Sequence, residues 1–146
     1  MKLKDSAGNV INAADRMFKA AANKLAVAQM HAADIASIAA ASPDATAGTV
    51  IDTSAVLEAW VQLKATGGNA LATGAVTAYI VASVNGTNYS TIGTPVAIAL
   101  AGTAVVIGEP VKLNLAGVKA IKLIKLVNGD ASYTATNVNV LIASYL

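Results

Sequence analysis

The chain has 146 residues, of which 55% are hydrophobic and only 12% are charged, with a net charge of +2 and no cysteine. This length is that of one ordinary domain with a real core, and the weak, dispersed positive charge excludes a nucleic-acid-binding protein. The lack of cysteine excludes a disulfide framework and thiolate chemistry, and so few charges leave apolar surface that we expect an assembly to cover.

The first part of the chain, residues 1–48, is predicted to be an arm that begins with a small hairpin over residues 2–11. A helix is expected over residues 13–30, because Asn12 suits an N-cap and apolar residues recur at helical spacing. Its apolar side includes the interface candidates Met17, Phe18 and Leu25. Two interpretations stay open, a helix packed on its own domain or an arm that docks on a neighbouring subunit.

The segment "ADIASIAAA", residues 33–41, favours an extended strand over the tail of that helix. A loop follows in "SPDATAGT", residues 42–49, where Pro, Asp and Gly interrupt regular structure. From residue 49 to residue 146 the composition changes to Thr, Val, Ile, Gly and Asn, the residues of strands and turns.

The stretch "AVLEAWVQLKA" alternates and predicts a strand with one apolar face. The inward residues are Leu57, Ala59, Val61 and Leu63. Trp60 falls on the polar face, where a tryptophan is either covered by the arm or exposed as an interface anchor.

The stretch "VTAYIVASVNGTNYSTIG", residues 76–93, predicts a β-hairpin. Its expected inward residues are Val76, Ala78, Ile80, Ala82 and Val84, and its outward residues are Thr77, Tyr79, Val81 and Ser83. Asn85-Gly86 favours a two-residue type I′ turn, with "TNYSTIG" as the return strand. Tyr79 is an interface candidate expected to pair with Trp60.

Four further strands complete the pattern. "TPVAIALAG" and "TAVVIGEP" are short and apolar, and "NVNVLIASYL" places Val138, Val140 and Ile142 on one face. In "VKAIKLIKLVN" the lysines are three apart, which breaks the period of two and indicates a β-bulge or an edge strand. Short strands separated by turns throughout this region predict a mainly β fold. The expected architecture is an antiparallel β-sandwich of jelly-roll or immunoglobulin-like type over residues 49–146.

The sequence contains too few chemically active residues for an enzyme. His31 is the single histidine, and Asp34 alone beside it does not complete a zinc site of three or four ligands. No pair of carboxylates, phosphate-binding loop or calcium motif is present, so neither a metal nor a cofactor is expected. The longest apolar run is too short to span a bilayer, and no secretory signal is recognised.

The segments "IDTSAVLEAWVQLKATGGNALATGAVTAYIVASVNGTNYSTIGTPVAI" and "LAGVKAIKLIKLVNGDASYTATNVNVLIA" carry a resemblance to known proteins. Together they resemble small structural proteins of tailed bacteriophages over about two thirds of the chain. The shared pattern is I-D-T-S before a strand, then a T-G loop, a strand into N-G-T-N, and a closing V-N-V strand. Val84 departs from the Asn or Asp that often precedes the turn, and Tyr89 replaces a frequent Trp.

This resemblance implies a virion protein that binds the capsid exterior and stabilises the shell, a decoration or cement protein synthesised in the host cytoplasm. Its implied partners are the major capsid protein and further copies of itself, without nucleic acid or membrane. The alternative is a carbohydrate-binding or receptor-binding module of a tail or fibre. A subunit of a cell-surface filament is a third, weaker hypothesis.

Overall fold

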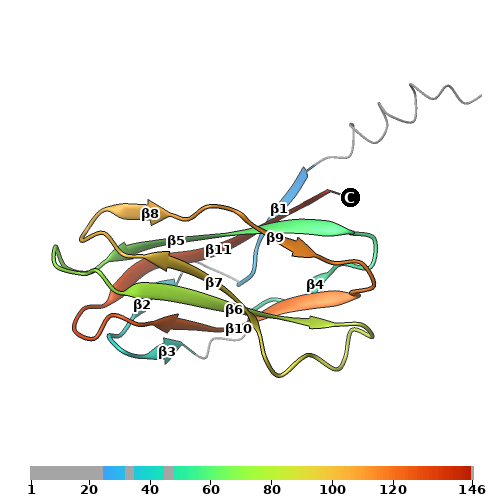
Figure 1. Ribbon diagram of the computed structural model, residues 1–146, viewed down its shortest axis with the longest axis horizontal. Coiled ribbons are helices and arrows are strands. Elements are labelled where there is room, and N and C mark those ends of the chain that lie inside the picture. The colour runs from blue at the N-terminus through green and yellow to red at the C-terminus, as the bar shows by residue number, and fades with distance from the viewer. Residues whose placement is uncertain (1–24, 32–34, 45–47, 146) are drawn as a thin grey trace, which may run out of the picture.

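The computed structural model describes residues 25–31, 35–44 and 48–145, which form two antiparallel β-sheets packed face to face (Figure 1). The β5 sheet contains β1 (Leu25–Gln29), β2 (Ile35–Ile38), β5 (Glu58–Gly67), β8 (Val105–Ile107), β9 (Val111–Asn114) and β11 (Ala135–Tyr145). The β6 sheet contains β3 (Pro43–Asp44), β4 (Ile51–Asp52), β6 (Ala75–Ser83), β7 (Thr94–Ala99) and β10 (Ala120–Asn128). The predicted antiparallel β-sandwich is therefore confirmed.

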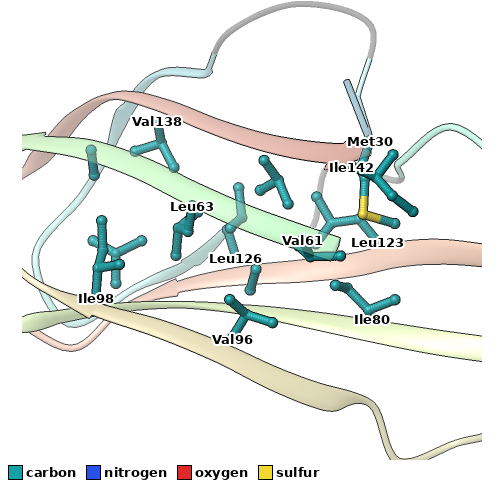
Figure 2. Close-up of a cluster of buried hydrophobic side chains, with 14 of the residues drawn as sticks. Met30, Val61, Leu63, Ile80, Val96, Ile98, Leu123, Leu126, Val138 and Ile142 are labelled. Atoms are coloured by element: carbon teal, nitrogen blue, oxygen red, sulfur yellow. The ribbon is translucent and has the colours of Figure 1, made fainter. Parts of the chain in front are cut away.

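The core lies between the two sheets and consists of small and medium aliphatic side chains (Figure 2). Strict alternation along β5 buries Ala59, Val61 and Leu63 completely, as the sequence predicted. The closing strand β11 buries Val138, Val140 and Ile142 on its matching face, also as predicted. Aliphatic side chains from the two sheets thus meet in one layer, which explains how a chain with so few aromatic residues forms a core.

A β-bulge in β10 accounts for the spacing of its lysines. Leu123 pairs with Ile80 and Lys125 with Tyr79, so Ile124 is an extra residue opposite β6. The extra residue shifts the in-and-out alternation of side chains by one position. Lys122 and Lys125, although three residues apart, therefore both lie on the outer face of the β6 sheet. Of the two predicted explanations the bulge is right, since β10 has neighbours on both sides.

The predicted inward faces are wrong at the strand ends. Leu57 and Val84 are 72% and 78% exposed, because β5 begins at Glu58 and β6 ends at Ser83. Val81 and Ser83, both predicted to face outward, are buried, and Val81 shows why. It lies cross-strand from Lys122, whose ammonium group contacts the Tyr89 ring of the β6–β7 loop. This loop therefore folds over the outer face of β6.

The hairpin of β6 and β7 exists, but its turn differs from the predicted one. Only Gly86 has a positive φ, of 79°, whereas a type I′ turn requires positive φ at Asn85 as well. The connection is a loop over residues 84–93, and the return strand starts at Thr94, so "TNYSTIG" is not a strand. The Asn85 side chain organises the loop by accepting backbone hydrogen bonds, which replaces the tight turn.

The predicted helix over residues 13–30 is wrong at its C-terminal end. Leu25–Gln29 is strand β1, and it pairs with residues 141–145 of β11. A partner strand has overridden the helical propensity of this Ala-rich segment, as tertiary contacts often do. The remainder of the predicted helix, with Met17 and Phe18, and the predicted hairpin over residues 2–11 lie outside the described residues. The expected extended segment is confirmed as β2.

Residues 25–52 close one edge of the sandwich by passing from one sheet to the other. Strands β1 and β2 pair with β11, whereas β3 and β4 pair with β10. Met30, which follows β1, is completely buried. Its N–H donates to the Val140 carbonyl at 2.9 Å, and its carbonyl accepts the Thr49 N–H at 2.8 Å. The described part of the segment assigned to an arm therefore supplies strands to both sheets.

Candidate interaction surface

Among the described residues, Asp130, which follows β10, is the acidic group that accepts the most hydrogen bonds. Its carboxylate accepts four backbone N–H bonds of 2.8–3.0 Å, two from Thr73 and Gly74 and two from Ser132 and Tyr133. The close approach requires glycine at position 74, where a Cβ atom would overlap the backbone of Asp130. Because both carboxylate oxygens are engaged by the fold, Asp130 has a structural role.

Stability should depend on this carboxylate at acidic pH. The backbone N–H groups of Ser132, Gly74 and Tyr133 lower the pKa of Asp130 from 3.8 to about 2. The unfolded chain therefore takes up the proton first, so stabilisation present above pH 3.8 is lost as the pH falls toward 2. Urea unfolding at several values between about pH 5 and pH 2 should show this loss of stability. Asp130→Asn has no titrating group at this position, so its free energy of unfolding should fall less steeply with decreasing pH than that of the wild type. An equally steep fall in the variant would show that Asp130 is not the group responsible.

His31 is buried, and its ring is also used by the fold. The Nε2 atom accepts a hydrogen bond from the Val140 backbone N–H at 3.0 Å, so this nitrogen is engaged inside the fold. Within residues 25–31, 35–44 and 48–145, no group of three or more His, Cys, Asp or Glu side chains is placed to hold a metal ion. The buried side chains of Asp130 and His31 therefore take part in the hydrogen bonds that hold the sandwich together.

Three exposed apolar side chains lie on loops that leave the strands at one end of the sandwich, which we call the loop end. It comprises the loops over residues 53–57, 84–93 and 115–119, at the right in Figure 1. Leu57, Val84 and Ile92 on these loops are 72%, 78% and 87% exposed, the highest values among the exposed large hydrophobic residues of the described chain. Exposed apolar groups of this kind mark contact surfaces when they occur together.

Hydrogen bonds join the 115–119 loop to the 53–57 loop and to the last residue of β6, where the 84–93 loop begins. The Leu115 N–H donates to the Leu57 carbonyl, and the Thr53 side chain donates to the Val118 carbonyl at 3.0 Å. The Lys119 N–H donates to the Ser83 carbonyl at the base of the 84–93 loop. A pocket of about 230 Å³ lies between the 53–57 and 115–119 loops. The loop end is thus a preorganised surface, which lowers the entropic cost of binding.

Few charges interrupt this surface. Asp52 lies beside it, and the backbone N–H and side-chain hydroxyl of Ser54, assisted by nearby Lys119, hold the pKa of its carboxyl below the ordinary value. Sequence patterning missed Leu57 and Val84 because it carried the alternation of the strands one residue too far. The polar residues Ser83 and Asn85, which flank Val84, were the signal that β6 had ended.

Trp60 lies half-buried on the outer face of the β5 sheet. Lys112 is its cross-strand partner on β9, with the ammonium nitrogen 5.9 Å from the ring centroid. The same lysine forms a 2.6 Å ion pair with Glu58. Trp60 is therefore partly covered by side chains of its own sheet.

Tyr79 lies half-buried on the outer face of the other sheet, where Lys125 stands 4.5 Å from its ring centroid. Tyr79 and Trp60 face away from the shared core in opposite directions, so the predicted pair is wrong. Among the remaining interface candidates, Leu25 belongs to β1 and pairs with Tyr145, and Met17 and Phe18 are not among the described residues. The structure therefore does not bring the five candidates together.

No protein-family model matches this chain, and no curated protein matches it significantly. Among the described residues, no helix has the length and apolar character needed to cross a membrane.

Proposed function

We propose that this chain is a non-enzymatic virion protein that binds the exterior of a bacteriophage capsid and stabilises the shell. The observation that carries the proposal is the loop end, where Leu57, Val84 and Ile92 are exposed on three loops and the 115–119 loop is hydrogen-bonded to the 53–57 loop and to the end of β6. The resemblance of the sequence to small structural proteins of tailed phages supplies the class of partner. A rigid body with a preformed apolar end suits a protein whose many copies each make a modest contact.

Removal of the apolar side chains of the loop end should abolish attachment without unfolding the sandwich. The variant Leu57→Ser, Val84→Ser, Ile92→Ser loses three exposed side chains, so its stability should change little. We expect wild-type protein to sediment with DNA-filled heads at near-stoichiometric copy number, and the variant to stay in the supernatant. Heads saturated with wild-type protein should also rupture at a higher temperature than bare heads.

A matched control is Leu71→Ser, Val105→Ser, Ile107→Ser, which removes three exposed side chains outside the loop end. This control should attach like the wild type. If both variants attach equally, the loop end is not the contact. If wild-type protein sediments with tails, or bare heads are as heat-resistant as saturated heads, the capsid-stabilising function is wrong.

The alternative function, a carbohydrate-binding module of a tail or fibre, is favoured by Trp60. Its half-exposed ring lies beside Glu58 and Lys112, and an aromatic face flanked by hydrogen-bonding groups suits a sugar ring. A glycan array tests it, because binding that disappears in Trp60→Ala would assign the chain to this class. Such a result together with no attachment to heads would replace the capsid proposal.

A further inference from the structure

The dipeptide Asn-Gly occurs twice in the chain, at residues 85–86 and 128–129, and the fold gives the two copies opposite environments. In this dipeptide the glycine nitrogen can attack the asparagine side-chain carbonyl, because glycine has no Cβ atom to shield the nitrogen. The attack closes a succinimide ring and expels ammonia. Whether the succinimide forms depends on which groups hydrogen-bond to the asparagine carbonyl, to the glycine nitrogen and to the amide nitrogen that leaves.

At Asn85 the carbonyl is activated by three donors. Its Oδ1 atom accepts hydrogen bonds from the Ser83 hydroxyl at 3.0 Å, the Thr87 N–H at 2.9 Å and the Asn88 N–H at 2.8 Å. Donors that converge on a carbonyl oxygen stabilise the negative charge that develops there when a nucleophile adds to the carbon. The same loop geometry that fixes the turn thus prepares this carbonyl for addition.

The Ser83 hydroxyl also contacts the attacking nitrogen. The Gly86 N–H donates to Ser83 Oγ at 2.9 Å, while Ser83 Oγ donates to Asn85 Oδ1. One hydroxyl therefore joins the group that must lose a proton to the group that must gain one. Within the described residues, no hydrogen bond engages the Asn85 amide nitrogen, which is the leaving group.

Asn128 has the reverse arrangement. It is completely buried, and its amide nitrogen donates to the carbonyl oxygens of Ile38, Ala39 and Tyr133 at 2.9–3.2 Å. The Gly129 N–H is engaged by the Ala75 carbonyl at 2.8 Å. Both the leaving group and the nucleophile are thus held in place at this second Asn-Gly.

We propose that the folded loop converts Asn85 into a succinimide and then into isoaspartate and aspartate, with Ser83 as the proton relay. The Gly86 nitrogen bonds to Asn85 Cγ while its proton passes to Ser83 Oγ and the serine proton passes to Oδ1. The tetrahedral adduct then collapses: the Cγ–Nδ2 bond breaks, the Oδ1 proton goes to the departing nitrogen, and ammonia leaves. Water opens the ring, so the net reaction consumes one water and releases one ammonia.

The product changes the loop end. A carboxylate replaces a neutral amide, beside the Lys119 side chain that lies next to Gly86. Isoaspartate also adds a methylene to the backbone between Val84 and Gly86 and makes Oδ1 a main-chain carbonyl oxygen, so the loop geometry set by the hydrogen bonds of Oδ1 has to change. Protein that has aged therefore presents Val84 and Ile92 differently from newly made protein.

Peptide mapping by mass spectrometry, with isoaspartate-specific methylation, tests the proposal on the full chain incubated for days at neutral to mildly alkaline pH. In folded protein we expect isoaspartate at residue 85 and none at residue 128, whereas urea-unfolded protein should react at both. Ser83→Ala should slow the reaction at residue 85 about fivefold, the effect of one lost hydrogen bond, and Ser83→Thr should keep the wild-type rate.

Asn128 is an internal reporter of folding in every variant, because unfolding would expose it and start its reaction. Equal reaction at residues 85 and 128 in folded protein, or none at residue 85, overturns the proposal. A wild-type rate in a folded Ser83→Ala variant overturns the relay.

Discussion

Replacement of Asn128 by alanine should lower the free energy of unfolding by about 3–5 kcal/mol. The Asn128 amide nitrogen donates to three carbonyl oxygens, and its Oδ1 atom accepts the Asp130 N–H at 3.0 Å. The side chain is completely buried, so water would not replace these partners. Urea unfolding followed by tryptophan fluorescence measures the change.

Asn128→Asp is the sharper variant, because it keeps the shape of the side chain. A carboxylate oxygen would face three carbonyl oxygens in place of the amide nitrogen, so we expect a loss at least as large as in the alanine variant. Asn88→Asp, on the exposed loop, is the matched control and should stay within about 0.5 kcal/mol of the wild type. A wild-type stability in Asn128→Asp would show that these hydrogen bonds do not hold the sandwich together.

Met30→Ala should destabilise the protein by about 2–5 kcal/mol, the range for a buried large-to-small change. Met30 is completely buried where residues 25–52 cross between the sheets, and it belongs to the core cluster (Figure 2). The cavity would lie between the sheets, next to β11. Differential scanning calorimetry or urea unfolding measures the loss.

Leu71→Ala is the control, since Leu71 is 69% exposed and its truncation should have almost no effect. The comparison decides whether residues 25–31 belong to the folded sandwich or form a detachable arm. An arm would tolerate Met30→Ala as well as Leu71→Ala.

Local patterning predicts the strands that have a long apolar period. β5 alternates from Glu58 to Gly67, so its buried residues are predictable one by one, whereas β11 is predictable only from Val138 on, after an irregularity between Thr136 and Asn139. The β10 bulge is visible because Lys122 and Lys125 break the period by one residue. In each case the apolar periodicity that predicts the strand lies within about ten consecutive residues, which is close to the window over which such periodicity is read.

The parts that were not predictable depend on distant partners. Leu25–Gln29 becomes a strand because residues 141–145 supply its hydrogen bonds, and its own composition favours a helix. The 84–93 loop replaces a tight turn because Ser83 and Asn85 bond to its backbone, a competition that the dipeptide signal does not show. The alternation of β5 and β6 correctly places Trp60 and Tyr79 on outward faces. It does not show that the two strands belong to different sheets, so it could not exclude a contact between the two rings.

The pairing of β1 with β11 also determines when the protein can finish folding. Leu25 lies opposite Tyr145, so the first described strand of the chain pairs with the last. During synthesis β1 leaves the ribosome long before its partner exists, and the edge of β11 that it covers forms only at the end. Contacts between residues so far apart in the sequence slow folding, and they leave β1 without its partner strand in the nascent chain. The edge of the sandwich formed by β1 therefore closes only after residues 141–145 have been synthesised.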